Sequence, residues 1–256
     1  EATGSLSMSY RVSQTSSSRT EAFGDASFRR VWLEPQAAEV SPDLNSADFE
    51  QLGLTFGLRH SWQAFSTLGP TSAALSFGTA YQAGDLASNW RMLEARQVLI
   101  QTQDHALRMV LQLRSDDRFD SSISSSVTRR IGGLYQVRLD GLELAAQIGV
   151  TDVTSNSALV EKDEVAAGIS VSGIGVGPFG LAISVDAAYA DFPKWVLTQG
   201  GRQDTSFGAR IEATYGAISV LGFSPSLTLS ARRTDSNLDI FDRSQTSLGL
   251  SFRSNF

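Results

Sequence analysis

The chain closes with the ten residues SLGLSFRSNF at positions 247–256, in which apolar and polar side chains alternate. Leu248, Leu250, Phe252 and Phe256 make up the apolar set, and glycine, serine, arginine and asparagine stand between them. Successive side chains of a β-strand point to opposite faces of the sheet. The stretch therefore predicts a strand with one apolar face and one polar face.

The same period of two recurs upstream, and helical spacing is nearly absent. Within 90–101 the alternation is poor and assigns no faces. Residues 15–48 leave two alternatives open: a long external loop with some β structure, or one or two further strands that raise the count to 14. Elsewhere the pattern predicts twelve strands, near 3–14, 49–62, 72–82, 88–101, 105–115, 121–139, 141–153, 162–174, 179–190, 203–217, 225–235 and 245–256.

The length and polar face of these strands indicate a transmembrane barrel. Strands in soluble sheets typically have ~5–6 residues, whereas strands that cross a bilayer at a tilt need ~9–11 residues. The polar face carries Gly, Ser, Thr, Gln and Arg, and only two of the 21 cationic residues are lysine. A soluble sandwich would place lysine and glutamate on that face, so this composition favours a wet, filled lumen. We therefore expect an all-β, antiparallel up-and-down barrel, a single domain over residues 1–256.

The connections alternate between short turns and long polar loops, as in outer-membrane barrels with short periplasmic turns and long external loops. Asp140-Gly141 is a tight-hairpin signal. We expect an integral protein of the bacterial outer membrane, with membrane lipids, lipopolysaccharide and the barrel assembly machinery as partners and both termini in the periplasm. Aromatic residues near strand ends resemble the girdles found at membrane interfaces. They are Tyr10, Trp62, Tyr81, Trp90, Tyr189, Trp195 and Tyr215.

Composition excludes several other classes of function. The chain has no cysteine, which excludes disulfides, thiolate metal sites and cysteine catalysis. The net charge of -6 argues against a nucleic-acid partner. His60 is expected on the lipid face and His105 in a short turn, so neither is placed for catalysis. We expect no metal, no cofactor and no enzymatic activity.

Arginines are the main candidates for function, because the alternation places many of them in the lumen. One interpretation is a positive lumen that attracts anions or acidic segments of a client protein. The other is a set of internal ion pairs between neighbouring strands. The expected lumen residues are Arg11, Arg59, Arg108, Arg114, Arg130, Arg138, Arg210, Arg232 and Arg253, with the acids Glu143, Glu164, Asp186 and Glu212.

Two parts of the sequence resemble known signals. The alternating last strand with Phe256 at its end resembles the outer-membrane assembly signal, carried here by Leu248, Leu250, Phe252 and Phe256. Residues 200–256 resemble the C-terminal barrel of the surface lipoprotein assembly modifiers, through an Arg-x-Asp strand start, a Gly-Phe-x-Pro turn and a Ser-Asn loop. The positions concerned are Arg202, Asp204, Gly222, Phe223, Pro225, Ser236 and Asn237.

That resemblance implies a barrel of 14 strands that helps to display a lipoprotein client at the cell surface. The family usually carries a helical-repeat domain before the barrel, and no 34-residue helical repeat is present in this sequence. The same motif residues also fit plain roles as a turn and a loop former. Three functions therefore stay open: lipoprotein display, a small passive pore with an arginine-rich lumen, and a structural or adhesive barrel.

Overall fold

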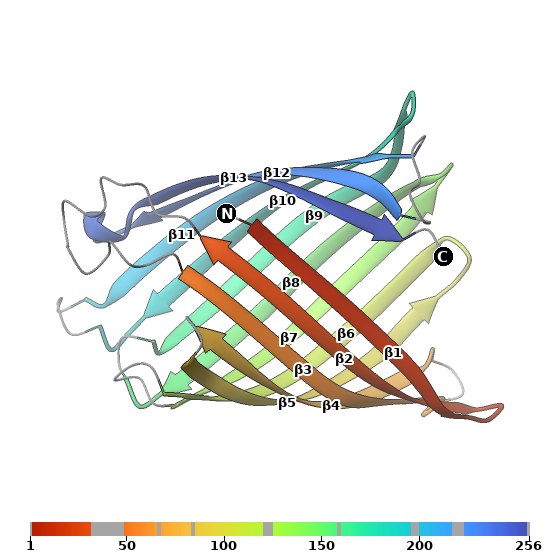
Figure 1. Ribbon diagram of the computed structural model, residues 1–256, viewed down its shortest axis with the longest axis horizontal. Helices are drawn as coiled ribbons and strands as arrows, with labels where there is room; N and C mark the ends of the chain where they lie inside the picture. Colours follow the sequence, from red (N-terminus) through yellow and green to blue (C-terminus); the bar gives the residue numbers. More distant parts are fainter. Residues whose placement is uncertain are drawn as a thin grey trace.

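The computed structural model describes residues 2–31, 49–65, 68–82, 85–119, 125–157, 160–195, 200–216 and 223–254. These residues form thirteen antiparallel strands that follow one another in chain order in one sheet, which curls into a barrel (Figure 1). Within the described ranges, no helix is long and apolar enough to span a bilayer. The elements are β1 (Ala2–Gln14), β2 (Ser18–Val31), β3 (Phe49–Trp62), β4 (Thr71–Gln82), β5 (Asp85–Gln101), β6 (His105–Arg118), β7 (Ser125–Leu139), β8 (Leu142–Ser155), β9 (Lys162–Val176), β10 (Phe179–Phe192), β11 (Arg202–Tyr215), β12 (Phe223–Ser236), the 3-10 turn η2 (Asp239–Phe241) and β13 (Arg243–Ser254).

All twelve predicted strands are present, with ends that differ by a few residues. Of the segment left open, residues 18–31 form β2, so the further-strand alternative is confirmed there, and residues 32–48 lie outside the described ranges. The alternation in β2 is weak because small residues face outward and Phe23 faces inward over Gly57 of β3. Phe56 of β3 covers the outer face at Gly24, where a Cβ would lie 3.3 Å from its ring.

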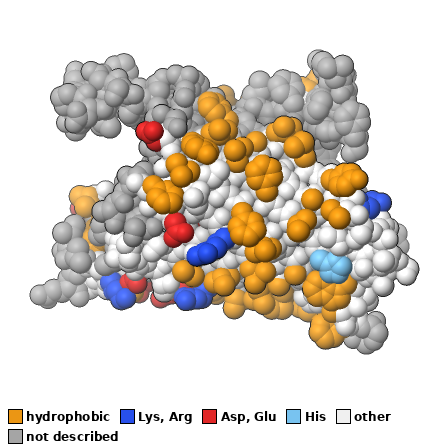
Figure 2. Space-filling view, turned by 60° about the horizontal axis from the view of Figure 1, so that its bottom comes forward, with side chains coloured by type: hydrophobic (Ala, Val, Ile, Leu, Met, Phe, Trp, Pro, Cys, Tyr) orange, Lys and Arg blue, Asp and Glu red, His pale blue; other side chains and the backbone are white. Residues whose placement is uncertain are grey.

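The barrel is apolar outside and polar inside, the reverse of a soluble protein. Large apolar side chains are exposed on the outer face of nearly every strand, for example Leu6, Phe56, Ile148, Ile169 and Leu229. Figure 2 shows them spread across one flank of the barrel with few charged groups among them. The most buried side chains are instead small serines, Ser76, Ser224 and Ser226. Only a hydrocarbon solvent makes this distribution favourable, so the protein is an integral barrel of the outer-membrane type.

The two ends of the barrel differ in the length of the connections between strands. The turn end carries tight connections such as Asp140-Gly141, whose φ values of 49° and 87° are both positive, as a type I′ hairpin requires. The loop end carries the described residues 156–157, 160–161, 193–195, 200–201 and 237–242, which stand between the strands. Outer-membrane barrels keep short turns in the periplasm, which places the loop end outside the cell.

The strand number changes the expected arrangement of the termini. An odd number of strands makes β1 and β13 run in the same direction, so β1 starts at the loop end and β13 ends at the turn end (Figure 1). The prediction that both termini lie in the periplasm is therefore wrong for the described chain. The two strands approach each other at the barrel seam, but no ladder of hydrogen bonds joins them within the described residues.

Candidate functional site

Residues that pair across neighbouring strands share a face of the sheet, so the strand register identifies the side chains that line the lumen. One row runs from Arg59 of β3 through Glu94 of β5 to Arg130 of β7 and Glu164 of β9. It alternates in charge, with small or amide side chains between the charged ones. The predicted lumen residues alternate along their strands with exposed apolar side chains of the outer face. This alternation and the register place all of them on the inner face. For Arg253 this concerns the backbone alone, since its side chain lies outside the described residues.

An ion pair that spans three adjacent strands lies on the lumen wall, near the middle of those strands. Asp186 of β10 and Arg232 of β12 both pair in register with Gly208 of β11, and the Arg232 guanidinium donates to the Asp186 carboxylate across that glycine. A Cβ at Gly208 would overlap the Asp186 carboxylate. The absence of a side chain at position 208 therefore allows the two charges to meet.

We expect Gly208→Ala to displace the Asp186 carboxylate and to lower the free energy of unfolding by about 0.5–1 kcal/mol, because it separates an ion pair that is partly exposed in the lumen. The matched control is Gly249→Ala on β13, where the nearest atom to the new Cβ, Thr228 Cβ, lies at 4.0 Å. Urea unfolding in phospholipid bilayers, followed by tryptophan fluorescence, measures both variants. Equal midpoints for the two would contradict the role assigned to Gly208.

Two further groups of charged side chains interact on the lumen wall. At the turn end, Arg138 Nε donates to Glu143 at 3.4 Å, and Gln136 links the other oxygen of Glu143 to Arg108. On β11, Arg210 lies 3.4 Å from the Glu212 carboxylate. Ser226 of β12 also donates to Glu212, at 3.0 Å. The predicted kind of ion pair, between neighbouring strands, is therefore present at Arg138 and Glu143, whereas Arg210 and Glu212 pair within β11.

Along the described parts of β5–β13, inward-facing cations outnumber inward-facing carboxylates. Seven inward carboxylates of these strands each have a cationic partner, and Asp85 at the start of β5 has none among the described residues. The seven are Glu94, Asp116, Glu143, Glu164, Asp186, Asp204 and Glu212. Four inward arginines have no carboxylate partner among the described residues: Arg108 donates to Gln136, Arg243 donates to Gln245, Arg130 lies beside Gly149, and Arg118 pairs in register with Ser88. The ion pairs thus leave a surplus of positive charge in the lumen.

The structure assigns the face of β5, which the sequence left open. Trp90, Glu94 and Arg96 point inward, and Glu94 is buried beside Arg96, with Arg96 Nε 2.6 Å from a Glu94 oxygen. The Trp90 ring fills the space above Gly78, and Cζ of Arg114 lies 4.7 Å from the centre of that ring. The prediction that Trp90 belongs to an interfacial girdle is therefore wrong. Tyr10 is exposed on the outer face, as expected.

Three aromatic rings surround Arg202 at the loop end of β11 and form an aromatic cage. The Arg202 Cζ lies 3.6 Å from the centre of the Phe241 ring, 4.5 Å from Phe192 and 5.2 Å from Trp195. Its Nε donates to Asp204 at 2.9 Å, and both side chains of this pair are mostly buried. Trp195 is itself buried, so the girdle prediction is wrong for this residue as well.

The Ser-Asn motif fastens the same region. Asn237 accepts the backbone N–H of Gln203 at 2.8 Å and donates to the Gly201 carbonyl at 3.1 Å. Ser236 donates its backbone N–H to Asp242 at 2.8 Å, which shapes the turn that contains η2. These motif residues, with Arg202 and Asp204, therefore form a latch that holds segment 237–242 against β11.

The other predicted motif positions are only partly described. Pro225 is the third residue of β12, as expected for a proline near a strand start, whereas Gly222 and the side chain of Phe223 lie outside the described residues. In the assembly signal, Leu248 is exposed on the outer face. The side chains of Leu250 and Phe252, and all of Phe256, lie outside the described residues.

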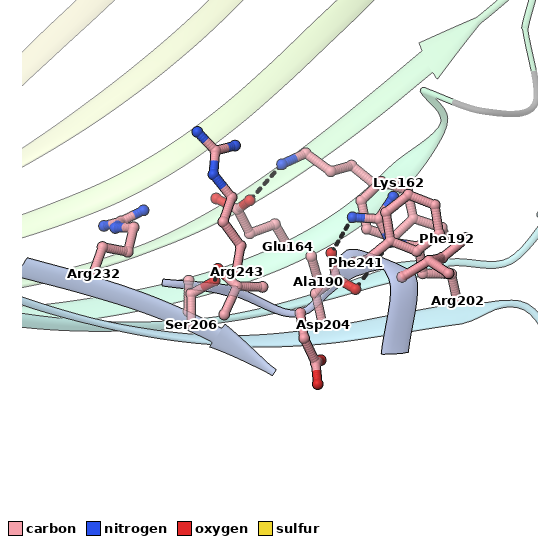
Figure 3. Close-up of a pocket in the computed structure, with 14 residues that line it drawn as sticks. Lys162, Glu164, Ala190, Phe192, Arg202, Asp204, Ser206, Arg232, Phe241 and Arg243 are labelled. Carbon is pink, nitrogen blue, oxygen red and sulfur yellow. Dashed lines mark hydrogen bonds and ion pairs between the residues drawn. The ribbon is translucent and has the colours of Figure 1, made fainter. Parts of the chain in front are cut away.

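Beside the cage lies a pocket of about 450 Å³, called the chamber below. Figure 3 shows Arg232, Arg243 and Lys162 projecting from β12, β13 and β9 into the same space, with Lys162 paired to Glu164. Apolar side chains, including Ile240 and Phe241 of η2, complete the lining. Sequence reasoning missed Lys162, Arg243 and the aromatic residues because they lie at strand ends and in loops, where a period of two carries no information.

The two histidines contact aromatic residues. His60 stacks on Trp62 with ring centres 5.4 Å apart and shares a hydrogen bond with Thr20 at 2.9 Å. His105 starts β6 and bonds to the Tyr135 hydroxyl at 2.9 Å. Across the described ranges, no three His, Asp or Glu side chains are grouped so that they could hold a metal ion.

Comparison with known proteins gives no family. No family model and no curated protein matches the chain. Similar solved structures include the KdgM porin in complex with disordered oligogalacturonate, at 11% identity and a TM-score of 0.43, with 98% of this chain and 99% of that chain covered. Others are a BenF-like porin from Pseudomonas fluorescens Pf-5 (9%, 0.47, 98% and 91%) and OccK10 from Pseudomonas aeruginosa (12%, 0.42, 100% and 94%). At such identities and scores, these likenesses do not bear on substrate or mechanism.

Proposed function

We propose that this barrel is a passive channel that prefers small anions. The observation that carries the proposal is the charge surplus of the lumen. Seven inward carboxylates of β5–β13 are each paired with a cation, whereas Arg108, Arg118, Arg130 and Arg243 have no carboxylate partner among the described residues and only Asp85 is an inward carboxylate without a partner there. A polar passage with fixed positive charge and low-dielectric walls concentrates anions and repels cations.

Arg108, Arg130 and Arg243, three of these arginines, lie at different heights of the barrel. Arg108 lies near the turn end beside Gln136, Arg130 lies in the middle of β7, and Arg243 lies at the loop end. An anion that enters from either side therefore meets one unneutralised guanidinium after another. Several weak sites in series permit conduction, whereas one strong site would trap the ion.

The test is the reversal potential of the reconstituted barrel in a planar bilayer under a KCl gradient. We expect the sign that corresponds to chloride preference. The triple variant Arg108→Gln, Arg130→Gln, Arg243→Gln should shift the permeability ratio toward one, since it removes three unpaired cations while leaving the ion pairs. The control is Arg233→Gln, an exposed arginine on the outer face of β12. Cation preference in the parent barrel, or no conductance, would overturn the proposal.

The resemblance over residues 200–256 supports a second candidate, which is lipoprotein display. Its motif residues Arg202, Asp204, Ser236 and Asn237 act in the latch, so they keep the loop end folded and leave the client contact to other residues. Protease shaving of a co-expressed lipoprotein, with and without the barrel, tests this candidate. Display that is unchanged without the barrel would count against it.

A further inference from the structure

The chamber at the loop end has a floor of small side chains and a charged rim. The floor is one row of the register, in which Ala188 of β10, Ser206 of β11 and Thr234 of β12 lead to Arg243 of β13. The hydroxyls of Ser206 and Thr234 bond to each other at 2.8 Å, so the floor offers little polarity of its own. Small residues here leave the volume of about 450 Å³ open.

Two arginines border this floor from adjacent strands. Arg232 and Arg243 are diagonal neighbours, because Thr234 pairs with Arg243 and Arg232 pairs with Gln245. Arg232 is engaged by Asp186, whereas the nearest partner of Arg243 is the neutral Gln245 at 3.2 Å. The Arg243 guanidinium therefore keeps its capacity to bind a carboxylate with two parallel hydrogen bonds.

Part of the chamber lining is apolar. Ile240 of η2 is 76% exposed although it lines the chamber, and Phe241 and Phe192 also belong to the lining. A ligand that covers this exposed isoleucine would remove its apolar surface from water. Ligand pockets commonly combine such apolar walls with a few placed charges in ~300–1,000 Å³.

The acids of the lining limit the charge that the ligand can carry. Glu164, Asp204 and Asp242 stand in the same lining as the cations. They repel a second negative charge, so a dianion such as phosphate is less favoured than a monoanion. We propose that the chamber binds an organic monocarboxylate with a compact apolar body, its carboxylate on Arg243 and its body against Ile240. This inference rests on the proposed function, because it names the solute class of that channel.

The probe is cyclohexanecarboxylate, added to the reconstituted barrel in a planar bilayer while the chloride current is recorded. The comparison solutes are acetate, which lacks the apolar body, cyclohexanol, which lacks the charge, and inorganic phosphate. We expect cyclohexanecarboxylate to reduce the current at a lower concentration than any of the three. Half-block at equal concentrations of cyclohexanecarboxylate and acetate would overturn the proposal.

Two variants locate the site. Arg243→Gln should raise the half-blocking concentration about tenfold, because it removes a charged hydrogen bond. Ile240→Ser should raise it as well and should bring cyclohexanecarboxylate closer to acetate. Both positions are exposed, so the variants are expected to fold, and Arg233→Gln on the outer face is the control. No change in either chamber variant would overturn the assignment of the site.

The outcomes separate this inference from the proposed function. Chloride preference without discrimination between the two carboxylates leaves the channel standing and overturns the chamber site. A barrel that conducts no anions overturns the channel. In that case calorimetric titration of the barrel in lipid nanodiscs with cyclohexanecarboxylate decides on the chamber alone, and no heat of binding overturns it.

Discussion

Replacing Ile148 by arginine is expected to lower the free energy of unfolding in bilayers by about 2–4 kcal/mol, the cost of a charge on the lipid face near the midplane. Ile148 stands in the middle of β8, and its side chain is 61% exposed on the outer face. In water this substitution would be neutral or favourable, so the loss measures the lipid contact itself.

Gln147→Arg is the matched control, because it places the same side chain at the same depth on the other face. The Gln147 amide points into the lumen over Gly168 of β9 and near Asp186 of β10. A guanidinium at this position would stay hydrated and would lie near the Asp186 carboxylate. We expect a change of about 0.5 kcal/mol or less at this position. Urea titration of the folded barrel in phospholipid vesicles measures both. A larger loss for Gln147→Arg would mean that the assigned faces are inverted.

Arg202→Met is expected to destabilise the barrel by about 3–5 kcal/mol, since removing one partner of a buried ion pair leaves the other charge unpaired. The substitution also removes the cation that three aromatic rings surround. We expect segment 237–242 to become sensitive to protease under conditions in which the barrel strands stay protected. Urea unfolding and limited proteolysis measure the two effects.

Arg233 provides a control with the same local sequence spacing, because it pairs with Asp235 as Arg202 pairs with Asp204. The Arg233 pair is exposed on the outer face, and Arg233→Met should leave the unfolding midpoint nearly unchanged. The double variant Arg202→Met, Asp204→Asn should recover part of the loss, since no buried charge then lacks its partner. Equal effects of the two arginine substitutions would refute the burial of the Arg202 pair.

The loops around the chamber are joined by a further ion pair. Lys194, which follows β10, lies 2.8 Å from Glu161, which precedes β9. Its hydrogen bond lowers the pKa of the Glu161 carboxyl. The contribution of this pair to loop stability is therefore present above the ordinary pKa of glutamate and is lost as the pH falls through the lowered value.

How far the sequence predicts the structure differs between the strands. β3 has the predicted bounds, Phe49 and Trp62, because its alternation is strong: Leu52, Leu54, Phe56 and Leu58 all face lipid. β2 was left open because Ala22, Gly24 and Ala26 face outward, and small residues give no signal on their own. Their apolar cover comes from Phe56 of the next strand.

The sequence by itself determined the class of fold, because a period of two sustained over strands long enough to cross a bilayer has one stable solution: apolar side chains toward lipid and polar ones toward a lumen. It also placed Arg108, Asp186 and Arg232 on the inner face. Which charges meet was decided only by the tertiary structure. Arg232 and Asp186 are 46 positions apart in the chain and meet because register and Gly208 align them. The cage around Arg202 likewise gathers Phe192, Trp195 and Phe241 from different segments, which alternation along any one strand does not encode.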